Sequence, residues 1–371
     1  MRILIINTLY APYRVGGAEI SVQLLAEGLV RFGNQVRILC LHEFDFIKKD
    51  IINGVEVCYL PLRNLYWPYN KKEEPSKIKK LIWHILDNYN PLMKENVRNE
   101  ILDFKPDIIH TNNLAGFSVA VWDVAKEEKI RIVHTARDYY LFHPNTTLFK
   151  NGELQNPNEV MVKIWSLVKR KKSRNVDYFV GISDFIRSIY VENGFFNQDC
   201  SNFIYNPVEK NIKKNIKKEI ETIGFIGRLT EDKGYDEYCN IAEKYKNKYK
   251  FLAAGRFNCN SQSVVLEKKS KDLGIQLLGF VEINDFINKV DAVILPIKWN
   301  EPFGRSVVEC ALSGIKVYTN KKGGVSELFN LFENIYQISE IAENQEITEV
   351  LEPECLSSDY IISKYLKVYG C

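Results

Sequence analysis

The sequence contains no C-x-x-C pair, no apolar run near the roughly 20 residues that a membrane-spanning helix needs, and no large excess of charge. The net charge of +3 gives no electrostatic indication of a nucleic-acid partner. The apolar start, residues 1–7, is too short for a secretory signal and predicts a buried strand. Free thiols in a reducing, cytoplasmic compartment are favoured because the eight cysteines are scattered, at positions 40, 58, 200, 239, 259, 310, 355 and 371.

Short apolar runs alternate with helix-spaced patterns along most of the chain. Such alternation is typical of βαβ units with parallel sheets, and 371 residues are enough for two domains. The first series predicts strands at 2–7, 36–41, 107–111, 130–135 and 177–182, with an insertion of loop and helix at 64–100. A second series follows a polar linker at 210–221 and predicts strands at 222–226, 250–254, 276–278, 292–295 and 316–319. We therefore expect two α/β domains, 1–206 and 207–356, and a terminal helix at 357–371.

The strongest chemical pattern lies in residues 295–314. A predicted buried strand ends at Pro296, and ligands of open α/β sheets bind beyond such strand ends. Glu301 follows in the loop, a helix is expected to begin near Gly304, and Glu309 comes about one turn into it. The first N–H groups of that helix can bind phosphate oxygens, and the two carboxylates can accept hydrogen bonds from sugar hydroxyls. A helix start that merely carries favourable acidic residues would look similar, but the Pro-Phe-Gly between the acids favours a ligand site.

This segment resembles the E-x7-E motif of retaining glycosyltransferases of family 4, which have the GT-B fold. The resemblance covers essentially the whole chain, and further segments match family motifs: Gly16–Glu19, Pro106–Asn113, Gly224–Gly234, Gly323–Glu327 and Tyr365–Tyr369. It implies an α/β fold of two Rossmann-like domains that face a central cleft. The first domain would bind the acceptor and the second the nucleotide sugar, and the C-terminal helix would cross back to the first domain.

The resemblance also implies which residues contact the donor, a nucleotide-diphosphate sugar. Glu301 is expected near the anomeric centre and Glu309 near the ribose. Arg228 and Lys233 are expected on the diphosphate, because two cations on a loop after a strand stabilise the charge of a departing diphosphate. The remaining expected contacts are Gly16 and Gly17 near the phosphates and acceptor, and Gly227, Gly255, Phe280, Val281, Phe303, Gly304 and Arg305 at the donor.

Gly255, Phe280 and Val281 fit ordinary strand-end turns equally well. The sequence contains no Asp-x-Asp, the motif with which many sugar transferases hold a divalent ion. We therefore expect neither a metal nor another cofactor, and side chains and helix dipoles would hold the diphosphate.

The first domain departs from the family pattern after the strand 130–135. Family members commonly read Thr-Leu-His-Asp-Tyr, whereas this chain reads Thr135-Ala-Arg-Asp-Tyr139, so Arg137 replaces the usual histidine. We expect Arg137 and Asp138 to form the functional pair, with Asp138 near the donor sugar or orienting the guanidinium. The alternative is that His134 contacts the sugar. An arginine cannot act as a base, but in retaining transfer the leaving phosphate itself can take the acceptor's proton.

Residues 161–174 form an amphipathic pattern that ends in the cationic cluster 169–172. We favour a solvated helix face for this segment. The alternative is a helix that lies on an anionic membrane and presents a lipid-linked acceptor.

Together these features predict a cytoplasmic, retaining hexosyltransferase of polysaccharide biosynthesis, whose acceptor is a cell-envelope glycan or a lipid-linked glycan. Two alternatives remain: a nucleotide-sugar epimerase of the same fold, and a catalytically idle, donor-binding partner subunit. A nicotinamide dehydrogenase is disfavoured, because no G-x-G-x-x-G follows the first strand.

Overall fold

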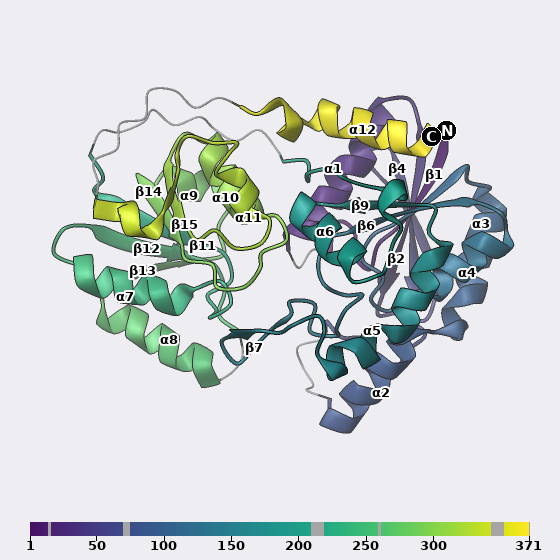
Figure 1. Ribbon diagram of the computed structural model, residues 1–371, viewed down its shortest axis with the longest axis horizontal. Helices are drawn as coiled ribbons and strands as arrows, with labels where there is room; N and C mark the ends of the chain where they lie inside the picture. Colours follow the sequence, from purple (N-terminus) through teal and green to yellow (C-terminus); the bar gives the residue numbers. More distant parts are fainter. Residues whose placement is uncertain (14–15, 70–74, 209–218, 259–260, 343–351, 371) are drawn as a thin grey trace. The chain divides into compact units, whose positions relative to one another are not determined.

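The structure is a computed structural model that describes residues 1–13, 16–69, 75–208, 219–258, 261–342 and 352–370 (Figure 1). The chain forms two compact units. Unit 1 comprises Met1–Leu148, Gln155–Pro207 and Ser358–Cys371, and unit 2 comprises Phe149–Leu154 and Val208–Ser357. The predicted linker at 210–221 lies mostly outside the described residues.

Unit 1 contains an eight-stranded sheet in the order β10-β9-β6-β5-β1-β2-β4-β3, in which only β3 and β4 pair antiparallel. Its strands are β1 (Arg2–Ile6), β2 (Gln35–His42), β3 (Lys48–Ile52), β4 (Val55–Pro61), β5 (Ile108–Thr111), β6 (Arg131–Ala136), β9 (Tyr178–Gly181) and β10 (Ser201–Phe203). Its helices are α1 (Gly17–Arg31), α2 (Lys77–Asn88), α3 (Lys94–Phe104), α4 (Ala120–Glu127), α5 (Val160–Lys172), α6 (Asp184–Glu192) and α12 (Ser358–Gly370), with short 3₁₀ turns η1 (Pro91–Met93), η2 (Ser173–Asn175) and η3 (Gln198–Cys200).

The terminal helix α12 packs on unit 1, as the sequence predicts for a helix that crosses back. Ile361, Ile362, Tyr365 and Tyr369 are buried in the same apolar core as residues of α1 and β1. Two polar contacts fix the helix further: the Tyr369 hydroxyl lies 2.7 Å from Nδ1 of His110. The Tyr365 hydroxyl lies 3.2 Å from the Thr135 hydroxyl. The helix therefore belongs to unit 1, although unit 2 precedes it in the chain.

Unit 2 contains a six-stranded, fully parallel sheet in the order β13-β12-β11-β14-β15-β16. Its strands are β11 (Thr222–Ile226), β12 (Lys250–Ala254), β13 (Gln276–Gly279), β14 (Ala292–Leu295), β15 (Lys316–Thr319) and β16 (Ile335–Gln337). Its helices are α7 (Tyr235–Tyr245), α8 (Ser261–Asp272), α9 (Ile283–Ile287), α10 (Arg305–Leu312) and α11 (Val325–Leu328), with the 3₁₀ turns η4 (Ile338–Ala342) and η5 (Glu354–Leu356).

Both sheets have the doubly wound strand order, which confirms the predicted α/β class. In chain order, the strands of unit 2 are arranged 3-2-1-4-5-6, the Rossmann arrangement. The order reverses between β11 and β14 in unit 2 and between β1 and β5 in unit 1. Ligands of such sheets bind outside the carboxyl ends of the strands at this switch point.

Several elements differ from the sequence expectation. The strands β3 and β4 were not predicted, although β4 is a buried, parallel neighbour of β2. The hairpin of β7 (Phe149–Lys150) and β8 (Glu153–Leu154) belongs to unit 2, although its residues fall within the range expected of the first domain. In the described part of the chain, no helix combines the length and apolar character that crossing a membrane requires.

Candidate active site

Two loops leave the switch point of unit 2 and are fastened to each other. The first, residues 227–234, follows β11, and the second, residues 296–304, follows β14. The carbonyl oxygen of Asp232 in the first loop accepts hydrogen bonds from the backbone N–H of Lys298 at 3.0 Å and of Trp299 at 3.4 Å. Residues from both predicted donor motifs are therefore held together at the ligand-binding edge of the sheet.

Glu301 and Lys233, one from each loop, are in direct contact. Nζ of Lys233 lies 2.5 Å from Oε2 of Glu301, and the indole N–H of Trp299 donates to the same oxygen at 2.9 Å. The Lys233 ammonium also lies 5.0 Å from the centroid of the Trp299 ring. The Glu301 side chain is only 13% exposed. Two donors on one oxygen therefore hold a largely buried carboxylate in one position.

Helix α10 begins at Gly304, as predicted. Gly304 has φ = +87°, and a Cβ there would lie 2.6 Å from a methyl group of Val325, so the position requires glycine. One turn into the helix, Nε of Arg305 donates to the Glu309 carboxylate at 2.8 Å. Both predicted donor-binding side chains are therefore present at the helix start and form an ion pair.

The Gly323-Gly324 turn packs directly on the loop that carries Glu301. The N–H of Gly324 donates to the carbonyl oxygen of Glu301 at 2.8 Å. A Cβ at Gly323 would lie 2.5 Å from that same oxygen. The Gly-Gly motif therefore acts here by close backbone approach, which fixes the position of Glu301.

Three predicted glycine and aromatic positions lie along one strand-end edge of unit 2. The N–H of Gly227 donates to the carbonyl of Ala254 at 3.0 Å, and the N–H of Gly255 donates to that of Gly279 at 2.7 Å. Phe280, which follows directly, is 66% exposed, and the Arg256 guanidinium lies 5.0 Å from its ring centroid. An exposed aromatic ring beside a glycine edge is suited to stacking on a planar ligand.

Three further predicted donor contacts differ in solvent exposure: Phe303, Val281 and Arg228. Phe303 is 2% exposed, so its side chain is packed inside unit 2, whereas Val281 is partly exposed. Arg228 is half exposed and pairs with Asp232 at 2.7 Å within its own loop. Arg228 is therefore accessible to an anion on the same loop as Lys233.

His134 lies inside the core of unit 1. It is in β6, 2% exposed, and Nδ1 is 2.9 Å from the hydroxyl of Thr111. The ring packs against Trp122 and stacks with Phe196 at a centroid distance of 5.7 Å. Burial lowers the pKa of His134 to about 3, so the ring is neutral at physiological pH. These contacts are those of a core histidine.

Arg137 follows β6 directly, as predicted, but its side chain binds protein amides. Nε donates to Oδ1 of Asn112 at 2.9 Å, and Nη1 donates to Oδ1 of Asn206. Asn112 lies in the segment Pro106–Asn113 that resembles a family motif, and Arg137 stands where family members commonly have a histidine. Side chains from these two segments are therefore in contact with each other.

Asp138, which is partly buried, adjoins three buried residues, Asp87, Lys169 and Tyr140, in a polar cluster that the sequence did not reveal. Oδ1 of Asp138 accepts a hydrogen bond from the Tyr140 N–H at 2.8 Å. Nζ of Lys169 donates to the Tyr140 carbonyl at 2.8 Å and lies 3.7 Å from the centroid of the Tyr140 ring. Lys169 is 2% exposed, which corrects its assignment to a surface cationic cluster.

Burial shifts each pKa in this cluster in the direction that favours the uncharged form of the group. It raises the pKa of Asp138 and of Asp87 to about 6, against the opposing effect of the Lys169 charge. It lowers the pKa of Lys169 to about 8. The Glu19 carboxylate contributes further to the raised pKa of Asp138. The sequence pattern of the helix gave no indication that the Lys169 side chain faces inward.

Gly16 and Gly17 start helix α1, close enough for their loop to influence Asp138. The N–H of Gly16 donates to Oε2 of Glu19 at 2.8 Å, so the Glu19 carboxylate caps the helix start. The electrostatic effect of Glu19 on Asp138 then connects this predicted glycine loop with the loop after β6.

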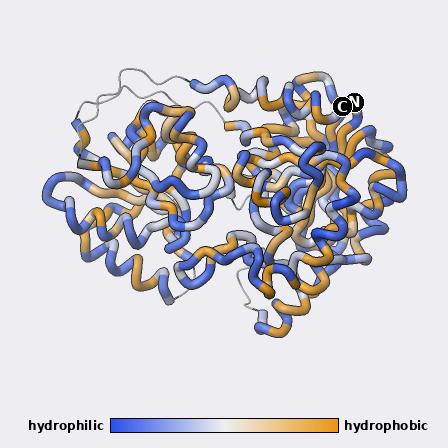
Figure 2. The backbone as a smooth tube through the Cα atoms, viewed as in Figure 1, coloured by the Kyte–Doolittle hydropathy of each residue, from blue (hydrophilic) through white to orange (hydrophobic). Residues whose placement is uncertain are grey.

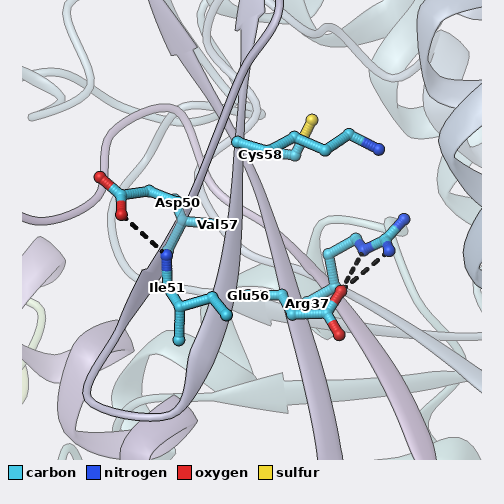
Figure 3. A pocket seen from close by; sticks show the side chains of 7 residues that line it. Arg37, Asp50, Ile51, Glu56, Val57 and Cys58 are labelled. Carbon is cyan, nitrogen blue, oxygen red and sulfur yellow. Dashed lines mark hydrogen bonds and ion pairs between the residues drawn. The ribbon is translucent and has the colours of Figure 1, made fainter.

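A separate pocket of about 290 Å³ opens at the edge of the unit 1 sheet (Figure 3). Both cations that line it are paired: Arg37 with Glu56 at 2.8 Å, and Lys49 with the neighbouring Glu100 at 3.0 Å. Burial raises the pKa of the Cys58 thiol to about 12. None of the predicted site residues lines this pocket, and its paired charges indicate a structural network.

Comparison with known proteins gives the class and then the family. Solved structures of similar fold include HepE of Anabaena in complex with UDP and glucose, with a TM-score of 0.65 and 16% identity, covering 100% of this chain and 97% of that chain. Sucrose-phosphate synthase of Thermosynechococcus elongatus has a TM-score of 0.68 and 13% identity, with coverage of 100% and 90%. These likenesses and the two doubly wound units define the GT-B fold.

The family follows from sequence matches. The family described as Glycosyltransferase Family 4 matches residues 15–211, and that described as Glycosyl transferases group 1 matches residues 208–360. A protein of Klebsiella pneumoniae, described as an uncharacterized 42.6 kDa protein in cps region, is 44% identical over 376 residues and covers all of both chains. The chain therefore belongs to glycosyltransferase family 4, as its motifs predicted.

Proposed function

We propose that this glycosyltransferase moves a hexose from a nucleoside-diphosphate sugar to a cell-envelope glycan or lipid-linked glycan, with retention of anomeric configuration. The Klebsiella relative from a cps region supports a role in polysaccharide assembly, and HepE, which resembles this chain in fold, was solved with UDP. A cytoplasmic location agrees with the free thiols at the six described cysteines: Cys40, Cys58, Cys200, Cys239, Cys310 and Cys355.

The contact between Glu301 and Lys233 at the switch point of unit 2 carries the proposal. A departing nucleoside diphosphate gains negative charge, and Lys233, with Arg228 on the same loop, supplies cations where that charge develops. Glu301 accepts hydrogen bonds from the donor sugar near its anomeric carbon, and Glu309 accepts them from the ribose. These side chains, with the N-terminus of α10, bind the diphosphate without a metal ion.

In unit 1, Asp138 is proposed to contact the reacting sugars. The Arg137 guanidinium, bound by Asn112 and Asn206, supports the loop that carries Asp138 and provides positive charge beside it. The leaving phosphate oxygen removes the proton of the acceptor hydroxyl, so this step needs no protein base. His134 supports the strand behind the loop.

Kinetics of two acid variants test the proposal. Glu301→Gln is expected to lower kcat about 10²- to 10³-fold, because it removes charge at the reacting centre. Glu309→Ala is expected to raise the donor KM about tenfold with a smaller effect on kcat. The exposed Glu243→Gln on α7 is the matched control and should behave like the wild type.

The assay uses nucleotide sugars with a glycan acceptor, and NMR reads the anomeric configuration of the product. Wild-type turnover in Glu301→Gln at saturating donor would contradict the assigned site. An inverted product would contradict retention, and conversion of the donor without acceptor would support the epimerase instead.

A further inference from the structure

An aromatic segment, Tyr-Trp-Pro-Tyr at residues 66–69, lies between β4 and α2 of unit 1. It belongs to the predicted insertion at 64–100, and the proposed site does not use it. Because β4, β2, β1, β5 and β6 are parallel, the segment follows the same carboxyl edge of the sheet as the loop that carries Asp138. The rings of Trp67 and Tyr69 meet at a centroid distance of 5.2 Å. We call this pair of side chains the aromatic platform.

The backbone that leads to the aromatic platform is fixed by buried side chains. The indole N–H of Trp83 on α2 donates to the carbonyl oxygen of Tyr66 at 3.0 Å, and Nδ2 of Asn64 donates to the Trp83 carbonyl at 3.2 Å. Nδ2 of Asn90 donates to the carbonyl of Arg63 at 2.8 Å. Trp83 is 4% exposed and Asn90 is fully buried. The segment is therefore a preformed loop on a rigid scaffold, which is where binding residues are commonly found.

The two rings of the aromatic platform are not needed to fill the core. Figure 2 shows the hydrophobic residues of unit 1 concentrated in the strands of its sheet. Tyr69 is 36% exposed and Trp67 is partly exposed, in contrast to the anchoring Trp83. Both rings therefore present aromatic surface to a ligand at the carboxyl edge of the sheet.

Carboxylates surround the hydroxyl end of Tyr69. Burial raises the pKa of Tyr69, and the charges of Glu19, Asp87 and Asp138 raise it further. Asp87 is buried and accepts a hydrogen bond from the N–H of Gly116. Glu19 and Asp138 are partly exposed, so these are the two carboxylates beside the platform that a ligand can reach.

Aromatic rings next to carboxylates have the chemistry that recognises a sugar. One face of a pyranose carries C–H groups, whose hydrogens are attracted by the negative face of an aromatic ring. The hydroxyl groups at the rim of the sugar donate hydrogen bonds to carboxylates. Ligand sites in general combine aromatic walls with a few polar groups that set the orientation. The platform, with Glu19 and Asp138, supplies both parts.

We propose that the aromatic platform binds the acceptor through a sugar ring that stacks on Trp67 or Tyr69 beside Asp138. This inference rests on the proposed function, in which Asp138 contacts the reacting sugars. The acceptor is then recognised as a saccharide. A free glycan and a lipid-linked glycan offer the platform the same ring.

Saturation-transfer NMR on the full-length protein without donor tests this binding. The probe is a set of lipid-free oligosaccharides, released by mild acid from the envelope glycan of cells that encode the chain. The wild type is expected to transfer saturation to sugar C–H protons. Trp67→Ala and the exposed-site variant Tyr69→Ser should each lower the affinity at least about fivefold, because the stacking surface is lost. Trp67→Phe, which keeps an aromatic face, should stay within about threefold of the wild type.

The matched control is Phe203→Ala on β10, toward the opposite end of the same sheet. Phe203 is 36% exposed, like Tyr69, and its ring lies 5.4 Å from that of Tyr205, so it belongs to a similar aromatic pair. This variant should bind oligosaccharides like the wild type. Thermal melting of each variant shows that it is folded.

Transfer kinetics show which substrate the platform serves. Trp67→Ala should raise the acceptor KM at least about fivefold and leave the donor KM unchanged. A raised donor KM would overturn the proposal, since the rings would then hold the nucleotide. Absence of oligosaccharide binding by the wild type, equal binding by Trp67→Ala, or binding that requires the lipid part of an acceptor would also overturn it. If the wild type binds oligosaccharides, Trp67→Ala does not, and no sugar is transferred, the platform stands and the proposed function fails.

Discussion

Lys169 is buried beside two carboxyl groups, whereas Lys171 of the same helix is exposed. Its ammonium fastens the Tyr140 carbonyl, and Tyr140 in turn holds the Asp138 carboxylate. The positive charge of Lys169 also favours the ionised forms of Asp87 and Asp138. At the scale of residues, Lys169 thus acts through Asp138, as a positioning residue.

Replacing Lys169 by Met should move the acid limb of the pH–rate profile to higher pH. The pKa of Asp138 is about 6 with the cation present and must rise when the cation is removed, so the ionised carboxylate forms at higher pH. The measurement is kcat/KM between about pH 5 and 9. Lys163→Met, an exposed position on the same helix, is the control and should leave the profile unchanged. An unshifted profile for Lys169→Met would leave Lys169 with a packing role alone.

The same pKa values fix the sign of the stability change with pH. A folded-state pKa of about 6 exceeds the ordinary value of 3.8, so Asp138 and Asp87 favour folding as the pH falls from about 6 toward 4 and oppose it above 6. Lys169, with its pKa lowered to about 8, opposes folding below pH 8, and this cost decreases as the pH rises toward 10.5. The charges of this cluster therefore lower the free energy of unfolding near neutral pH, as is expected of charges that serve a function.

Arg137→Lys and His134→Gln should have different consequences. Arg137→Lys should lower kcat because a point charge cannot reproduce the guanidinium contacts with Asn112 and Asn206. His134→Gln should lower the free energy of unfolding by about 1–3 kcal/mol, because the ring fills the core beside Trp122 and Phe196. Kinetics and urea unfolding separate the two effects. A histidine titrating near 6.5 in the pH–rate profile would contradict the neutral, buried His134.

At the scale of elements, one of the hydrogen bonds that join helix α12 to the rest of unit 1, that of the Tyr369 hydroxyl, can be removed alone. Tyr369→Phe deletes the hydroxyl beside His110 and leaves a ring nitrogen in the core without that contact. It should cost about 1–3 kcal/mol in the free energy of unfolding, measured with urea. Lys367→Ala, an exposed position on the same helix, is the control. Equal stability of both variants would show that apolar packing alone retains the helix.

The sequence predicted most elements and missed those with weak or ambiguous patterns. The strands β1, β2, β5, β6 and β9 have buried apolar runs and were predicted to within a residue or two. Strand β3, in contrast, has the exposed sequence Lys48-Lys-Asp-Ile-Ile52 and is formed by pairing with β4. Backbone pairing with β4 forms this strand, and its own side chains show no alternating apolar pattern, so the local sequence could not predict β3.

At the scale of the whole molecule, the motifs of unit 2 could be predicted from the sequence, because glycines and charged residues follow the ends of predicted strands. The strand order then brings Lys233 and Glu301 together, although 68 positions separate them. The cluster around Lys169 was not readable: it depends on which way one helix faces, and an amphipathic pattern with a cationic end fits several orientations. The contact between Arg137 and Asn112 likewise appears only once β5 and β6 are paired.

The reaction as a whole should survive chelation of divalent ions. In the proposed site, positive charge for the diphosphate comes from Lys233, Arg228 and the start of α10 rather than from a metal ion. We therefore expect the transfer rate to be unchanged in EDTA within about twofold. The assay compares the purified enzyme before and after EDTA treatment, with a metal-dependent transferase as the positive control. Loss of activity in EDTA that magnesium or manganese restores would contradict this prediction.

The return of α12 to unit 1 also has a consequence for biosynthesis. Translation proceeds from the N-terminus, so the ribosome makes all other described elements of both units before Ser358–Gly370. Until then the surface of unit 1 that receives Ile361 and Tyr365 is uncovered, and the nascent chain presents it to chaperones while unit 2 is being made. A premature stop codon just before Ser358 would thus damage the unit translated first and leave intact the unit translated last.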